Sequence, residues 1–184
     1  MARANVSITD KRKDWDKFVK NYKTGSKKKS VATRIGLFGK KSSEIVQIGT
    51  QHEFGVGFWE PQEDNDPRTV KAVQEWKALG KRVPKKIFIP ERSFLRSTID
   101  DKKTKIRKFV IALVAASFKK NDVNIVKILN LIGFKVVSEV QLKITKGDDD
   151  WPKNSPFTIF RKGSTKPLLD TGRMRQSISH ELDK

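Results

Sequence analysis

The residues that could carry acid–base or metal chemistry are few and lie far apart in this chain. It has two histidines, His52 and His180, and no cysteine. Glu53 follows His52, but the zinc-protease pattern needs a second histidine four residues on, and none is there. A metal or catalytic site would require His52, His180 and carboxylates such as Asp170 to converge. We therefore expect no catalytic residue, no metal and no cofactor, and predict a protein that is not an enzyme.

Two other short patterns superficially resemble ligand sites. The stretch 36–42, Gly-Leu-Phe-Gly-Lys-Lys-Ser, has the composition of a phosphate-binding loop. That loop needs four residues between its first glycine and the Gly-Lys-Ser/Thr, so a plain hairpin turn is favoured. Three consecutive aspartates, 148–150, could bind a cation. Adjacent side chains cannot all point one way in an extended chain, so a solvated turn is favoured there.

The strong positive charge predicts an acidic partner. The formal net charge is +19, which would attract nucleic acid, an anionic membrane surface or acidic proteins. The longest apolar run, 109–118, is too short to span a bilayer, and the first residues lack the apolar run of a signal peptide. Candidate contacts with DNA or an acidic partner lie in predicted loops: Lys27, Lys28, Lys29, Lys40, Lys41, Lys81, Arg82, Lys85 and Lys86.

Aromatic placement weighs against a module that reads nucleic-acid bases. Base stacking requires exposed aromatic side chains interleaved with the basic ones. Most aromatic residues fall on predicted core faces, and Phe58, Trp59 and Trp151 are the main exceptions. Non-specific attraction to phosphates therefore remains the more economical expectation for DNA.

The elements that must position these residues indicate one α+β domain over 1–184. Alternation predicts a β-hairpin from Val31–Phe38 and Glu44–Gly49, with a third strand over Gln176–Leu182 beside it. Apolar residues at helical spacing predict a helical hairpin, with one helix from about Glu91 to Lys120 and a second from Asp122 to about Lys146. The small antiparallel sheet should pack on this hairpin, which should hold most of the core.

Shorter helices complete the prediction. One should run from Asp10 to about Tyr22, and another from Pro67 to about Leu79 within a projecting insertion at 60–86. A helical turn is expected over 157–162, and a short helix around 168–174, where Asp170 or Thr171 could cap it.

Four segments, in order along the chain, resemble one known family. They are Ile48–Gly55, Ile89–Arg96, Ser155–Gly163 and Pro167–Ile178, and they hold, among others, His-Glu-Phe-Gly, Ile-Pro-Glu-Arg-Ser-Phe-Leu and Leu-Leu-Asp-Thr-Gly-Arg-Met. In these motifs the chain resembles the virion-morphogenesis family of tailed bacteriophages. The 60–86 insertion is longer than that family's pattern.

The resemblance implies a structural protein of the neck, at the head–tail joint of the virion, present in the host cytoplasm during assembly. It implies a ring, expected to be a hexamer, that contacts head–tail connector or adaptor proteins and the tail terminator or the tail tube and sheath. Packaged DNA would be attracted by charge alone, and no membrane is involved. Alternatives are a tail terminator that caps the tail tube, or a basic DNA-binding structural module. The residues expected to support the fold or its assembly are His52, Glu53, Phe54, Gly55, Pro90, Phe94, Leu95, Pro167, Leu168, Asp170, Thr171, Gly172 and Met174.

Overall fold

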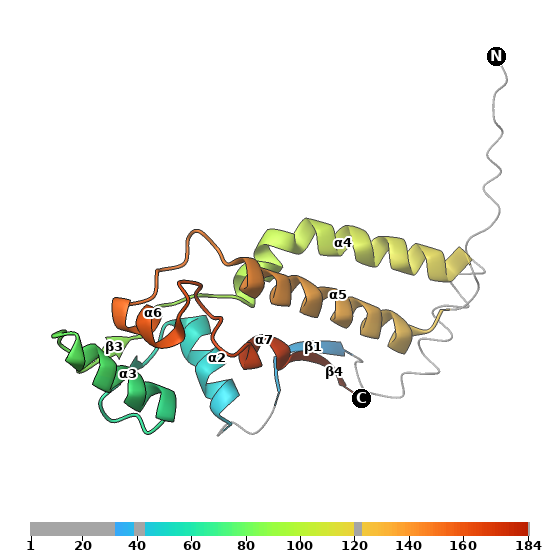
Figure 1. Ribbon diagram of the computed structural model, residues 1–184. Helices are drawn as coiled ribbons and strands as arrows, with labels where there is room; N and C mark the ends of the chain where they lie inside the picture. Colours follow the sequence, from blue (N-terminus) through green and yellow to red (C-terminus); the bar gives the residue numbers. More distant parts are fainter. Residues whose placement is uncertain (1–31, 39–42, 120–122, 184) are drawn as a thin grey trace, which may run out of the picture.

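A computed structural model describes residues 32–38, 43–119 and 123–183, and shows an elongated α+β arrangement (Figure 1). The helix predicted over 10–22 lies outside these residues. In chain order the elements are β1 (Ala32–Leu37), α2 (Glu44–Phe54), β2 (Phe58–Trp59), α3 (Pro67–Ala78), β3 (Ile87–Phe88), α4 (Arg96–Lys119), α5 (Ile125–Lys146), α6 (Pro156–Lys162), α7 (Arg173–Gln176) and β4 (Ile178–Asp183). Two long helices lie side by side at one end, and α3, β3 and α6 gather at the other (Figure 1).

The main sheet joins the two ends of the described chain. Strand β1 pairs antiparallel with β4, so that Leu37 lies opposite Ile178 and Ile35 opposite His180. Helix α5 packs against both strands, and α4 packs on α5. The predicted α+β class, a small antiparallel sheet on a long helical pair, is therefore confirmed, as is the C-terminal strand.

The predicted hairpin is wrong, because Glu44–Gly49 forms the first half of helix α2 and not a strand. Ser43 caps this helix by accepting a hydrogen bond from the N–H of Val46, and Gly55 ends it in the left-handed conformation. The alternation of Ile45, Val46 and Ile48 with polar residues fits a strand, but the caps at both ends select the helix. Strand β1 is left with β4 as its partner within the described residues.

The long helical pair is confirmed with shifted starts. Helix α4 begins at Arg96, five residues later than predicted, because Glu91–Leu95 forms the turn that precedes it. Helix α5 begins at Ile125, where the Asn124 side chain accepts a hydrogen bond from the N–H of Lys127. Contrary to the expectation that both helices share the core, α5 supplies most of the helical core residues, whereas only Thr98 is buried in α4.

The described residues pack into two hydrophobic cores. The larger lies between α5, the sheet and the C-terminal turns; its buried members are Phe94, Val136, Val140, Ile144, Trp151, Leu168, Met174 and Ile178. The smaller lies between α3 and α6 and is centred on Phe157, with Ala72, Val83 and the half-buried Trp59 and Trp76 around it. Trp151, expected outside the core, is buried within the larger one. Within the described residues, no helix is long and apolar enough to cross a membrane.

Candidate functional site

A pocket of about 660 Å³ lies where the two cores meet. It is surrounded by helix α2, by strands β2 and β3, which pair antiparallel, by α6 and by the stretch before α7. Each of the four segments on which the family resemblance rests contributes to its wall: His52 comes from the first, Arg92 from the second, Arg161 from the third and Asp170 from the fourth. Residues separated by more than a hundred positions in the sequence are thus brought to one place.

Behind the pocket, a carboxylate ties the first two segments together. Glu53 is 4% exposed, and its carboxylate accepts hydrogen bonds from the Ser93 hydroxyl and from the backbone N–H groups of Phe94, Leu95 and Arg96, at 2.7–3.0 Å. The Arg96 guanidinium also donates to it at 3.1 Å. Because the first N–H groups of a helix have no partner within the helix, Glu53 serves as the cap of α4. We call Glu53 with Ser93–Arg96 the Glu53 junction.

Electrostatics at the Glu53 junction favour the charged carboxylate. Burial raises the pKa of Glu53, but hydrogen bonds from the N–H groups of Leu95 and Arg96, joined by those from Ser93 and Phe94, outweigh it, and the pKa falls below its ordinary value. The group is therefore an ionised structural element and not an acid poised to donate a proton.

Gly55 explains why the chain can turn at this point. It adopts φ 63°, and a Cβ atom there would lie 2.5 Å from the backbone nitrogen of Glu91. Only glycine fits such a turn pressed against another backbone. Phe54, just before it, is exposed and lies under the Arg96 guanidinium at 4.8 Å. The His-Glu-Phe-Gly and Ile-Pro-Glu-Arg-Ser-Phe-Leu motifs are thus two halves of one structural joint, whose Phe94 is fully buried and whose Leu95 is partly buried.

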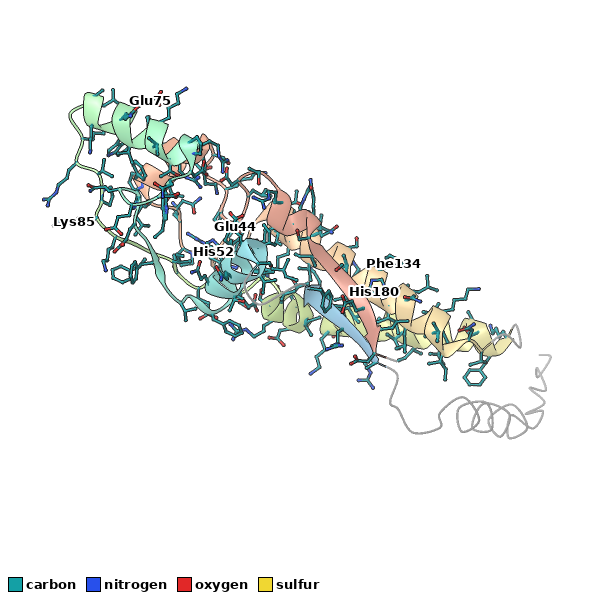
Figure 2. The ribbon with its side chains drawn as sticks, turned by 90° about the horizontal axis from the view of Figure 1, so that it is seen from below. Glu44, His52, Glu75, Lys85, Phe134 and His180 are labelled. Atoms are coloured by element: carbon teal, nitrogen blue, oxygen red, sulfur yellow. The ribbon has the colours of Figure 1, made fainter. Side chains whose placement is uncertain are left out.

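The two histidines do not converge. His180 on β4 hydrogen-bonds Asn130 through Nε2 at 3.1 Å and packs against Phe134, while His52 lies on α2 beside the pocket (Figure 2). Within the described residues, no three His, Asp or Glu side chains gather as metal ligands would. The hypothesis that pairs His52 with His180 at a metal therefore fails on geometry.

Three nitrogen-bearing side chains form the basic wall of the pocket. Arg92 is 3% exposed and donates from Nε to the carbonyl oxygen of Pro152 at 2.8 Å and from Nη2 to that of Lys153 at 3.1 Å. Lys162 donates from Nζ to the carbonyl oxygen of Lys166 at 2.8 Å. Nδ1 of His52 is buried and has no hydrogen-bond partner in the described structure. We call Arg92, Lys162 and His52 the basic wall.

Burial and neighbouring cations disfavour positive charge in the basic wall. Burial, and then the charges of Arg92 and Lys162, lower the pKa of His52 to about 4. Burial is also the main cause that lowers the pKa of Lys162 to about 8; the attraction of Asp170 opposes this shift, and the repulsion of Arg92 and Arg161 adds to it. Neither Arg92 nor Lys162 forms an ion pair with a carboxylate among the described residues. At neutral pH the wall therefore holds two partly desolvated cations beside a neutral imidazole.

The opposite side of the pocket is balanced in charge. Asp170 accepts from Arg68 at 3.2 Å and from Arg161 at 3.0 Å, and Asp66 lies 3.1 and 3.6 Å from the same two guanidinium groups. This ring of two carboxylates and two arginines links α3, α6 and residues 167–172 before α7, which we call the closing stretch. Asp170 is thus an ion-pair residue and not the helix cap that the sequence suggested.

The closing stretch is a series of turns before the short helix α7, so the helix predicted around 168–174 is wrong in its start. Leu168 adopts φ 59°, a strained value for a side chain of its kind, and its buried side chain holds it in the larger core. Gly172 adopts φ 79° and opens α7; it has no side chain to cap the helix, and the Thr171 hydroxyl accepts a long hydrogen bond from the N–H of Arg173 at 3.5 Å. The remaining predicted residues divide between wall and core: Pro90 and Thr171 line the pocket, Pro167 is half-buried beside it, and Met174 also reaches the larger core.

The predicted basic contacts lie elsewhere. Lys81, Arg82, Lys85 and Lys86 are exposed on the loop after α3, at the end of the molecule where Lys85 is seen in Figure 2. Lys86 pairs with Glu60 at 3.0 Å and lies over Phe58, and Lys81 lies over Trp76. Lys27, Lys28, Lys29, Lys40 and Lys41 lie outside the described residues.

The sequence singled out His52 of the basic wall but neither Arg92 nor Lys162. Arg92 and Lys162 lie inside the second and third resembling segments, and no charge pattern separates them from the other 38 basic residues of the chain. The one usable signal was their presence in segments otherwise rich in apolar and turn residues. No family model, curated protein or solved structure matches this chain.

Proposed function

We propose that this chain is a structural protein of the neck of a tailed bacteriophage, where it forms a ring that completes the tail or joins it to the head connector. The observation that carries the proposal is the convergence of the four resembling segments. They lie apart in the sequence, yet all four line one pocket, and the first two share the Glu53 junction. Motifs that hold a fold together are what a family of structural subunits would retain.

The roles of the motif residues support a structural rather than a chemical function. Glu53 caps a helix, Gly55 permits a turn, Phe94 and Met174 fill the core and Asp170 pairs with two arginines. His52 and Lys162 do have lowered pKa values, but no hydrogen bond joins either of them to a hydroxyl nucleophile among the described residues, as an acid–base mechanism would require.

A ring requires a surface for a neighbouring subunit, and α5 offers a suitable face. Leu131, Phe134 and Leu142 are spaced so that they fall on one side of the helix, and all three are exposed, Phe134 at 63%. Large exposed apolar patches mark protein contacts. We propose that this α5 face meets a second copy of the chain, and that the ring then contacts connector or adaptor proteins on one side and tail proteins on the other.

The test compares oligomeric state in two matched variants. Native mass spectrometry and negative-stain imaging of the full chain should show a closed ring, expected to be a hexamer. Phe134→Ser should shift the protein to monomers, while Phe88→Ser, which removes a still more exposed phenylalanine (76%) at the other end, should leave the ring intact. A wild-type chain that stays monomeric at high concentration and is absent from purified virions would refute the proposal.

The tail-terminator alternative uses the same ring, and only its position in the virion separates the two roles. Cryo-EM of the intact virion would place the ring between connector and tail, or directly on the last turn of the tail tube.

A basic DNA-binding module is the second candidate, favoured by the +19 charge. Exposed lysines and an arginine on α4 add to it: Lys103, Lys105, Arg107 and Lys108. Titration with duplex DNA at two salt concentrations distinguishes this candidate from non-specific attraction, because binding by charge alone weakens steeply as salt rises. Tight binding that survives high salt would favour the DNA-binding module. Of the three aromatic residues that the sequence left for base stacking, Trp151 is buried, Trp59 is half-buried and Phe58 is exposed; the structure also exposes Phe54, Phe88 and Phe134.

A further inference from the structure

We infer that the pocket binds an oxyanion, a carboxylate or phosphate group of a small organic ligand, held by Arg92 and Lys162. Both cations line the pocket, both are withdrawn from water to a large extent, and neither has a carboxylate partner among the described residues. Desolvated charge without a counter-ion is costly in a folded protein. A bound oxyanion would supply the missing counter-ion.

Some of the charged residues that line the pocket form ion pairs with each other, and other lining cations lie outside these pairs. Three lining arginines are already paired: Arg68 and Arg161 with Asp66 and Asp170, and Arg173 with Glu44 at 3.2 Å. The fourth lining carboxylate, Asp64, accepts hydrogen bonds from the Trp59 indole and the Thr69 hydroxyl. The described lining thus holds six cations and four carboxylates, and the cations outside these ion pairs include Arg92 and Lys162.

His52 is the third residue of the basic wall. Its Nδ1 atom is buried without a hydrogen-bond partner in the described structure, and an unpaired buried nitrogen is itself unfavourable. Arg92 lies directly beside it, since the backbone N–H of Arg92 donates to the carbonyl oxygen of His52 at 2.7 Å. In this structure the nitrogen is closed off from water, so Arg92 and Lys162, and not His52, carry the inference.

The size and the remaining lining define the ligand class. A volume of about 660 Å³ exceeds what a bare phosphate fills and lies in the range of small-molecule sites. Ile45, Ile48 and Ile89 contribute an apolar side. The ligand is therefore an organic acid or an organic phosphate. A nucleic-acid strand fits less well, because the carboxylates of Asp66, Asp170 and Glu44 would face its other phosphates.

Every residue of this site belongs to one chain, so binding is expected of a monomer and of a ring alike. The inference therefore does not depend on the proposed neck function, and either can fail without the other.

The experiment follows binding of inorganic phosphate and of benzoate to the full chain near pH 7, by two-dimensional ¹H–¹⁵N NMR, with sodium chloride holding ionic strength constant. We expect saturable shifts, with the Trp59 indole N–H among the signals that move. Lys162→Met should weaken binding about tenfold, the loss typical of one charge-assisted hydrogen bond. Lys166→Met removes the same charge four residues away, outside the pocket lining, and should bind as the wild type does.

Comparison of the two probes identifies the head group, since tighter binding of phosphate indicates a phosphate ligand and tighter binding of benzoate a carboxylate. Binding should also weaken above about pH 8, as Lys162 loses its proton against the pull of Asp170. Equal weakening in Lys162→Met and Lys166→Met would mean non-specific attraction to a basic protein and would overturn the inference. So would the absence of saturable shifts with either probe. Lys162→Gln provides a second variant that keeps a polar side chain at the site.

Discussion

The Glu53 junction and the basic wall are neighbouring regions that differ in how their buried charge is paired. Glu53 is an anion that receives hydrogen bonds from four backbone or hydroxyl donors and an arginine. Arg92 and Lys162 are cations that donate to backbone carbonyl oxygens and lack a carboxylate of their own. One region satisfies its charge internally, whereas the other leaves charge available.

This difference separates stability from binding. A satisfied buried ion holds distant segments in place, and removing it exposes every donor that it had paired. An unsatisfied buried ion weakens the fold, and such groups persist where a ligand or partner completes them. We therefore expect substitutions at the Glu53 junction to destabilise the protein and substitution of Lys162 in the basic wall to leave stability almost unchanged near neutral pH.

Glu53→Gln should have the largest effect, a loss of ~3 kcal/mol in the free energy of unfolding. The amide of glutamine would place its own N–H₂ against donors that need an acceptor. Urea denaturation at neutral pH measures the loss. Glu91→Gln is the matched control, because Glu91 is exposed and pairs with the same Arg96, and it should cost less than about 1 kcal/mol.

The same stabilisation depends on pH with a defined sign. The folded pKa of Glu53 lies below its unfolded value of 4.5, so its contribution is complete above that value and is lost as pH falls through the folded pKa. Acid unfolding of Glu53→Gln should lack this component. A variant as stable as the wild type at neutral pH would show that the junction does not hold the fold.

Two glycines extend the comparison to the backbone. Gly55 belongs to the junction and Gly172 lines the pocket, and both have positive φ. Gly55→Ala should cost ~3 kcal/mol, because strain adds to a contact of 2.5 Å with the backbone of Glu91. Gly172→Ala should cost ~1 kcal/mol from strain alone, since its nearest neighbour would lie at 3.7 Å. Thermal unfolding of both variants tests the order, and equal losses would contradict it.

Valine at position 172 should destabilise the protein more than alanine does. A β-branched side chain tolerates positive φ poorly, and we expect Gly172→Val to impair folding or ring assembly. Circular dichroism with native mass spectrometry distinguishes these two outcomes. A Gly172→Val chain that folds and assembles as the wild type does would contradict the prediction.

Sequence periodicity was sufficient for elements with strong local signals. Pro67 after Asp66, and a long run of apolar residues at helical spacing, placed α3 and α5 nearly correctly. It failed for α2, where Ile45, Val46 and Ile48 favour a strand by composition and the caps at Ser43 and Gly55 decide otherwise. The start of α4 was missed because its cap is Glu53, more than 40 residues earlier, and no local pattern reports a cap supplied from a distance.

The pocket could not be predicted from the sequence, for a related reason. The motif residues were identified, but which of them touch depends on how α2, α6 and the closing turns come together. Arg68 pairs with Asp170 across 102 positions of the sequence, and no local pattern around either residue predicts this ion pair. The charge of Lys162 stands out only when burial and the absence of a carboxylate partner in the described structure are both known.

His52 should give a smaller, pH-dependent effect. Its folded pKa of about 4 lies below the unfolded value of 6.5, so the unfolded chain binds the proton more readily, and stability falls as pH drops from 6.5 toward 4. At about pH 5.5 this difference costs ~1 kcal/mol, and His52→Gln should remove it. Urea denaturation at that pH and at neutral pH measures it, with His180→Gln as the control. An unchanged pH dependence in His52→Gln would place His52 in contact with water.

Lys162→Met should have the smallest effect near neutral pH, within about 1 kcal/mol of the wild type, because the aliphatic stem is kept and the loss of the hydrogen bond to the Lys166 carbonyl oxygen is offset by removal of a desolvated cation. Its folded pKa of about 8 lies below the unfolded value of 10.5, so the wild-type protein should gain stability as pH rises between these values. The variant lacks this gain, and the difference between the two denaturation curves at about pH 7 and about pH 9.5 isolates it from the titration of other lysines. Lys166→Met should follow the wild type at both pH values. If Lys162→Met instead loses as much stability as Glu53→Gln, Lys162 is satisfied within the fold, and the contrast between the two regions disappears.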